Sequence, residues 1–181
     1  MPFHFETTQW LPYPPELVFA FFANPENLPR LLPRWQRARI EEAVFAPPPP
    51  RPEGAPRYPG IAAGTGTRLT ISLRLIPFIP MRIPWEAQIE DFRWNQSFCD
   101  TQLRGPFKSW RHCHTVTAAP SPQYSGQPGT TLHDAVTYEL PLGPLSNLTH
   151  TLILRYQIAR IFRYRQHRTA ELLTLMTGRG Q

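Results

Sequence analysis

The hydrophobic pattern of the chain changes period within "TTLHDAVTYELPLGPLSNLTHTLILRYQIARIF", residues 130–162. Over residues 130–140 apolar and polar side chains alternate, which is typical of a β-strand with one buried face. After Pro144 the apolar residues recur at helical spacing, and this pattern continues to about Met176. The stretch therefore predicts the last strand of a sheet followed by one long C-terminal helix.

Alternation predicts further strands upstream, and proline-bounded stretches predict two short helices. The other strands are expected at residues 3–11, 35–45, 67–75, 82–92, 97–104 and 107–119. The helices are expected between residues 14 and 33, directly after the first strand, with Asn24-Pro25 separating them. Residues 46–64 form a proline-rich loop, and we expect its part from Ala46 to Gly60 to be mobile and dispensable for folding.

Length and composition favour a single α+β domain over residues 1–181. The net charge of +6 permits an anionic partner. We expect no nucleic-acid partner, because no stacking aromatic residues accompany a single basic stripe. The sequence predicts no transmembrane segment and contains no signal-peptide pattern. Because Cys99 and Cys113 form no CxxC motif, we expect two reduced thiols and a cytoplasmic location.

Three segments and the order of the elements carry a family resemblance. The segments are "FETTQWLPYPPELVFAF" (residues 5–21), "FCDTQLRGPFKSWRHCH" (98–114) and "GTTLHDAVTYELPLG" (129–143). They resemble a bacterial ligand-binding subgroup of the START-like superfamily, also called SRPBCC, of polyketide cyclase/dehydrase and lipid-transport proteins. This resemblance implies the helix-grip fold, in which a curved, seven-stranded antiparallel sheet wraps around the C-terminal helix. It also implies a ligand cavity between sheet and helix.

Two neighbouring strands place polar side chains on the face that we expect to be buried. Trp110, His112 and His114 share one face of their strand, and Asp134 and Tyr138 share the more apolar face of the next. These side chains could provide the few polar contacts of an otherwise apolar pocket. Alternatively, they form an ordinary structural pair, in which Asp134 or Tyr138 holds a buried histidine by a hydrogen bond.

The sequence thus predicts that the protein binds a hydrophobic small molecule or lipid. The expected ligand-binding residues are Trp85, Phe98, Trp110, His112, His114, Asp134, Tyr138, Leu152 and Tyr156. The alternative is an enzyme of the cyclase/dehydratase type that uses His112 and Asp134 as an acid–base pair. Two histidines and one carboxylate could also bind iron or zinc, but no further histidine lies on these inner faces. We therefore expect no metal and no cofactor.

The turn "LIPFIPM", residues 75–81, is apolar where turns are normally polar. We expect it to be at least half exposed and to form a lid at the cavity mouth, with Phe78 and Ile79 at its tip. Such a lid would touch the ligand or make a peripheral contact with a membrane surface. The alternative is packing against a neighbouring loop or a second subunit, so the sequence is also compatible with a homodimer.

Overall fold

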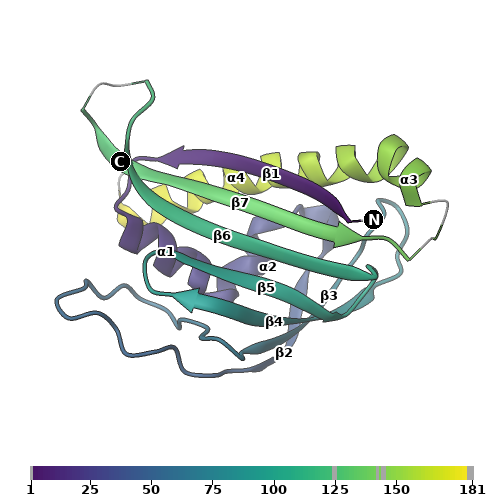
Figure 1. The fold of residues 1–181 in the computed structure, drawn as a ribbon, viewed down its shortest axis with the longest axis horizontal. Helices are drawn as coiled ribbons and strands as arrows, with labels where there is room; N and C mark the ends of the chain where they lie inside the picture. Colours follow the sequence, from purple (N-terminus) through teal and green to yellow (C-terminus); the bar gives the residue numbers. More distant parts are fainter. Residues whose placement is uncertain (1, 124–125, 142, 144–145, 179–181) are drawn as a thin grey trace.

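The computed structural model describes residues 2–123, 126–141, 143 and 146–178. Within these residues the chain forms a seven-stranded antiparallel sheet of order β1-β7-β6-β5-β4-β3-β2 (Figure 1). The strands are β1 (Phe3–Leu11), β2 (Arg39–Val44), β3 (Arg68–Leu73), β4 (Ile83–Arg93), β5 (Ser97–Arg104), β6 (Ser109–Pro120) and β7 (Pro128–Glu139). The helix-grip fold and the strand predictions are confirmed, and only β1 joins the sheet beside a strand distant in sequence.

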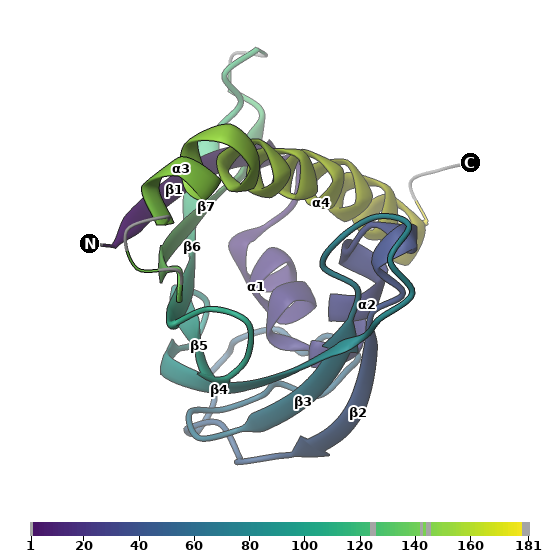
Figure 2. The ribbon, with the colours of Figure 1, turned by 90° about the vertical axis from the view of Figure 1, so that its right-hand side faces the viewer.

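Short helices follow β1, and a long helix ends the chain. They are α1 (Pro15–Ala23), η1 (Pro25–Asn27), α2 (Leu28–Leu31), η2 (Arg34–Gln36), α3 (Ser146–Thr149), the π-helical η4 (His150–Leu154) and α4 (Arg155–Thr177). In Figure 2 the strands form an arc from β1 through β5 to β2, and α4 crosses the open side of this arc. The start of the predicted tail helix, residues 144–145, lies outside the described residues.

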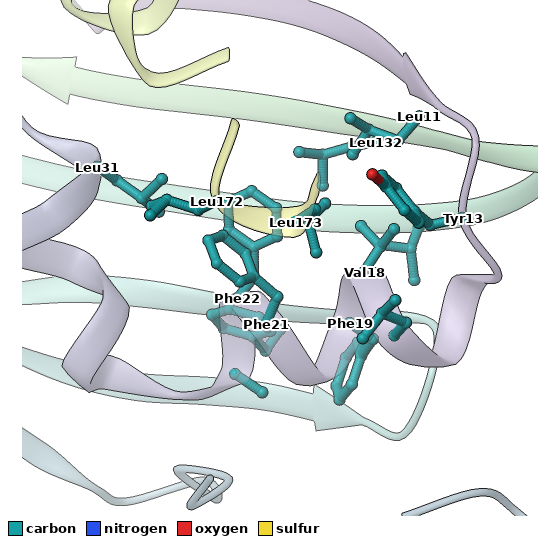
Figure 3. Close-up of a cluster of buried hydrophobic side chains, with 14 of the residues drawn as sticks. Leu11, Tyr13, Val18, Phe19, Phe21, Phe22, Leu31, Leu132, Leu172 and Leu173 are labelled. Carbon is teal, nitrogen blue, oxygen red and sulfur yellow. The ribbon is translucent and has the colours of Figure 1, made fainter. Parts of the chain in front are cut away.

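Helix α1 lies inside the arc of strands, on the same side of the sheet as α4 (Figure 2). Pro15 occupies its first turn, where no backbone donor is needed, and the helix ends before Pro25. Most of its side chains are buried, because they pack between the sheet and the C-terminal half of α4 (Figure 3). Leu172 and Leu173 of α4 join this core cluster. The dense core thus fixes one end of α4 against the sheet.

The proline-rich segment makes a few contacts with the domain, although most of its residues are exposed. The indole Nε1 of Trp94 donates to the carbonyl of Pro49 at 2.7 Å, and the Arg51 guanidinium lies 4.1 Å from the centre of the Trp94 ring. Near the end of the loop, the Ala63 amide donates to the Ala23 carbonyl at 3.0 Å. Prolines lack backbone donors but retain carbonyls, which neighbouring side chains can bind. The mobility of the loop and its dispensability for folding stay predictions.

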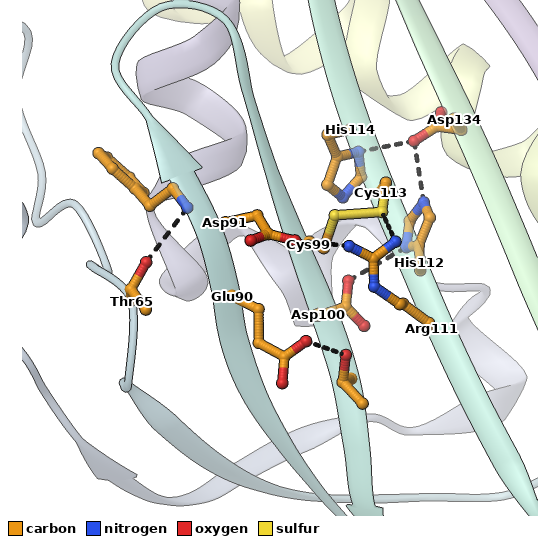
Figure 4. Close-up of a disulfide and its surroundings, with 12 residues drawn as sticks. Thr65, Glu90, Asp91, Cys99, Asp100, Arg111, His112, Cys113, His114 and Asp134 are labelled. Atoms are coloured by element: carbon orange, nitrogen blue, oxygen red, sulfur yellow. Dashed lines mark hydrogen bonds and ion pairs between the residues drawn. A yellow bond between two sulfur atoms is a disulfide. The ribbon is translucent and has the colours of Figure 1, made fainter.

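The two cysteines form a disulfide, which corrects the expectation of two reduced thiols. Cys99 of β5 and Cys113 of β6 are register partners, and their Cα atoms are 4.0 Å apart (Figure 4). Sequence alone did not predict the pair, because the strand register decides which residues face each other.

No helix in the described part of the chain is long and apolar enough to cross a membrane.

Candidate ligand-binding site

A cavity of about 600 Å³ lies between the inner face of the sheet and α4. Its walls are mostly apolar. The sheet contributes Leu69, Ile71, Leu73, Ala87 and Ile89, α4 contributes Ile158, Ile161 and Phe162, and the short helices contribute Phe22 and Leu31. One core cluster packs the C-terminal half of α4 against α1, and a second packs Ile158 and Phe162 of α4 against β7, so the cavity lies beside these contacts.

Five of the predicted ligand-binding residues line this cavity: Trp85, Phe98, Trp110, His112 and His114. Period-two alternation carries their side chains to the concave face of β4, β5 and β6. The rings of Trp85 and Trp110 meet edge to face, with centroids 5.2 Å apart. Together they form an aromatic wall near the hairpin that joins β5 to β6.

Asp134 and Tyr138 lie behind this wall rather than on its surface. Each is only 1% exposed, and neither is among the residues that line the cavity. The Tyr138 ring packs against Trp110, with centroids 5.8 Å apart. Burial raises the pKa of the Tyr138 hydroxyl to about 12. Both residues can therefore support the wall, but they do not contact the cavity directly.

The expectation that Leu152 and Tyr156 line the cavity is corrected, because they are 63% and 58% exposed and neither lines it. Leu154 and Ile158 line it instead. Leu152 lies in η4, where a π-helical turn takes more residues than an α-helical turn and so shifts the helical phase. Tyr156 lies in the regular helix, two residues and about 200° from Ile158, and so faces the opposite way.

The turn between β3 and β4 reaches the cavity through its first residues. Leu75 and Ile76 line the cavity, whereas Phe78 and Ile79 do not. Phe78 is fully exposed and has a left-handed backbone (φ 70°), and Ile79 is 41% exposed. The side-chain amide of Gln157 donates to the Leu75 carbonyl, which links this turn to the start of α4.

Charged and polar side chains form one connected cluster on the cavity wall (Figure 4). His112 lies between two carboxylates, with Nδ1 3.2 Å from Oδ2 of Asp100 and Nε2 3.0 Å from Oδ1 of Asp134. His114 Nδ1 lies 2.6 Å from the same Asp134 oxygen. On the other side of the His114 ring, Arg165 Nη2 donates to Nε2 at 3.1 Å. Three strands and α4 thus meet in a chain of five polar residues.

The contacts set the protonation of this cluster. Burial alone would lower the pKa of His112, but the Asp100 charge and hydrogen bonds to both carboxylates raise it above its usual value. Burial would raise the pKa of Asp134, but the histidines and Arg165 hold it well below its usual range. The pKa of Asp100 is also lowered, since His112 outweighs burial. Each ring nitrogen of His112 faces a carboxylate oxygen, which can only accept, so both nitrogens carry a proton and His112 is a cation between two carboxylates.

The second histidine behaves in the opposite way. Burial lowers the pKa of His114 to about 4, and the neighbouring charge of His112 adds to this effect. An arginine can only donate, so Nε2 of His114 must accept from Arg165. The ring proton then lies on Nδ1, on the side of Asp134. His114 is consequently neutral near pH 7.

Three of these residues, Asp100, His112 and His114, place one possible ligand atom each within 4.8 Å of one another. Carboxylate and imidazole ligands suit zinc or iron. However, both nitrogens of His112 already contact carboxylates, and the Arg165 guanidinium occupies Nε2 of His114. A metal would have to displace these contacts in competition with a nearby cation. The expected absence of a metal stays a prediction.

Asp100 and Arg165 were not predicted as site residues, although both line the cavity. Asp100 lies two residues after Phe98 on the same strand, so the alternation that identified Phe98 contained the signal. Arg165 follows Ile158 and Phe162 at helical spacing, which is the signal that could have found it, although arginines are rarely buried. Its 8% exposure shows that the helix turns this residue inward.

A family model described as polyketide cyclase / dehydrase and lipid transport matches residues 11–160. The chain belongs to this family. No protein with a curated description matches this chain. The family match covers most of the chain and includes strands β2 to β7, the last residue of β1 and the start of α4.

Several solved structures share the fold of this chain at low sequence identity. CV1439 from Chromobacterium violaceum superposes with a TM-score of 0.61 at 14% identity, covering 94% of this chain and 96% of its own. TTHA0849 from Thermus thermophilus gives 0.59 at 15%, covering 93% and 98%. Ara h 8.0201 gives 0.56 at 16%, covering 94% and 99%. At these identities, the likeness supports the fold alone.

Proposed function

We propose that this family member binds a hydrophobic small molecule or lipid in the cavity between sheet and α4. The observation that carries the proposal is the cavity of about 600 Å³ with predominantly apolar walls. Ligand pockets of proteins are typically mostly apolar and carry a few polar groups that orient the ligand. Native mass spectrometry of the purified protein would test the proposal by detecting a bound small molecule.

Filling the cavity should abolish most of this binding. Ala87 faces the cavity from the middle of β4. We expect Ala87→Phe to weaken binding of the apolar fluorophore 1-pyrenebutanol by about tenfold or more, because the added ring occupies space needed by the ligand. Gln88→Phe is the matched control, since it puts the same ring on the opposite face of the strand. Equal affinity of Ala87→Phe and wild type would place the fluorophore outside the cavity.

We also propose that the turn between β3 and β4 is a lid at the cavity mouth, with Phe78 and Ile79 as its exposed contact residues. Phe78→Ser/Ile79→Ser should slow uptake of 1-pyrenebutanol from phosphatidylcholine vesicles several-fold. The melting temperature should change little, because both side chains are exposed and contribute little to the core.

Val44→Ser/Phe45→Ser is the control for this lid, because Val44 and Phe45 are also exposed apolar residues but do not line the cavity. Vesicle uptake at the wild-type rate in the Phe78/Ile79 variant would remove the lid. A dimer that dissociates in this variant on a sizing column would instead assign the turn to a contact between two subunits.

Catalysis of the cyclase/dehydratase type is a second candidate function, favoured by the charged cluster on the cavity wall. The expected acid–base pair, His112 and Asp134, is poorly placed to act on a ligand. Asp134 does not line the cavity, and both nitrogens of His112 already contact carboxylates. Asp100 is the carboxylate that faces the cavity. Its lowered pKa makes it a weak base, which is poorly matched to proton transfer near pH 7. Ligand binding is therefore the better supported function.

Two further expectations remain predictions beside this proposal. The cytoplasmic location is one, and the Cys99–Cys113 disulfide argues against it because disulfides persist in oxidising compartments. The homodimer is the other expectation, and the elution volume of the wild-type protein on the same sizing column would show whether it forms.

A further inference from the structure

The polar cluster ends on an arginine whose donors are only partly used. Arg165 is 8% exposed and lines the cavity. Its Nη2 donates to His114, while its Nε is enclosed without an acceptor. Within the described residues no ion pair joins Arg165 to a carboxylate. A guanidinium has five N–H donors, so most of its hydrogen-bonding capacity is unused.

The charges of Asp100 and Asp134 act on Arg165 from a distance, but in the described part of the chain neither carboxylate contacts its guanidinium. Asp100 and Asp134 both contact His112, which is held as a cation. The residue that does accept from Arg165 is His114, and this ring is neutral because its pKa is lowered to about 4. The guanidinium thus meets a neutral acceptor on one side and unfilled space on the other.

The remaining surroundings of Arg165 are apolar. The guanidinium carbon lies 5.2 Å from the centre of the Phe22 ring and 5.7 Å from that of Phe162. A buried cation is costly unless an anion and good hydrogen bonds accompany it. A carboxylate satisfies both needs, because its two oxygens match two adjacent N–H groups of arginine.

We infer that the ligand of this cavity carries a carboxylate, which Arg165 binds, and an apolar body that extends toward the aromatic wall of Trp85 and Trp110. This inference rests on the proposed function. Ile153 lines the cavity near the start of the helix, and Arg165 lies about 18 Å further along it at the usual rise per residue. The carboxylate would therefore enter first, and the apolar body would fill the outer part.

Asp100 limits where the carboxylate can lie. Its side chain is 25% exposed and faces the same cavity. The carboxylate is expected on the side of Arg165, separated from Asp100 by the His112 ring, because His112 offsets the Asp100 charge. A ligand with a cationic head would meet Arg165 and His112 and is disfavoured by both.

The test compares two fluorophores that differ only at the polar end, 1-pyrenebutyrate and 1-pyrenebutanol. Wild-type protein at pH 7 should bind the carboxylate about tenfold or more tightly than the alcohol, because charge-assisted hydrogen bonds are stronger than neutral ones. Arg165→Met should remove this preference and retain affinity for the alcohol. Arg163→Met is the matched control, since Arg163 is an exposed arginine of the same helix, and should behave as wild type.

The outcomes separate this inference from the proposed function. If wild type binds both fluorophores equally, the cavity takes apolar ligands and the carboxylate inference is wrong. If neither fluorophore binds, the proposed function itself fails. A preference that persists in a folded Arg165→Met variant would place the carboxylate elsewhere. Should that variant not fold, the wild-type comparison still decides, and Arg165→Lys tests the residue with its charge retained but its fork geometry lost.

Discussion

Asp134→Ala is expected to lower the free energy of unfolding by about 3–5 kcal/mol, as is typical when one partner of a buried charged pair is removed. Asp134 is 1% exposed, and one of its oxygens meets both His112 and His114. Without this carboxylate the two rings lose their shared partner in a place that water does not reach. Urea denaturation followed by tryptophan fluorescence would measure the loss.

The control for Asp134→Ala breaks an ion pair on the opposite face of the sheet. Arg111 of β6 contacts Asp91 at 2.7 Å, and both side chains are substantially exposed, at 45% and 66%. Arg111→Ala should cost no more than about 1 kcal/mol, because water replaces such a partner. If Asp134→Ala were as mild as this control, the buried cluster would contribute little to stability.

Acidification from pH 6.5 to pH 4 is expected to reduce the free energy of unfolding by about 3 kcal/mol through His114 alone, because folding lowers the pKa of this ring from 6.5 to about 4. Between these two values the unfolded chain binds the proton more readily than the folded one. Acid therefore favours unfolding in this window. The raised pKa of His112 acts only above pH 6.5, where its stabilisation is lost as pH rises.

The pH effect can be assigned to His114 by substitution. In His114→Gln an amide oxygen can still accept from Arg165, but no group titrates, so the stability of the variant should change much less between pH 6.5 and pH 4. His133→Gln, which alters a histidine whose side chain is 38% exposed, should retain the full dependence. Denaturation curves at several pH values would show the difference, and identical slopes for His114→Gln and wild type would refute the assignment.

The sequence predicted the sheet and five of the side chains that line the cavity, because alternation fixes which side chains share a face. His112 and His114 on β6 and Asp134 on β7 were placed on inner faces by this rule alone, and the strand register then brought them into contact. Alternation contains no information on depth. It could not distinguish Trp110, which faces the cavity, from Tyr138, which lies behind it.

The helix was harder to predict, because its inner face depends on a continuous helical phase. The π-helical turn at His150–Leu154 changes that phase, and no residue type in it signals the change. Leu152, which lies in this turn, was assigned to the cavity but is exposed. Tyr156 and Arg165 lie in the regular helix beyond the turn, so the phase change does not account for them. The disulfide escaped for a related reason, since its cysteines are separated by 14 positions in sequence and only the register of β5 with β6 joins them.

The helical turns before α4 are held less tightly than α4 itself. Leu172 and Leu173 of α4 belong to the cluster with α1, and Ile158 and Phe162 pack against β7, whereas Leu148, Leu152 and Ile153 of the preceding turns are exposed. Local opening of a segment costs only the contacts that the segment makes. A ligand could consequently enter by displacing the first turns of the helix together with residues 75–81, while the core around α1 stays folded.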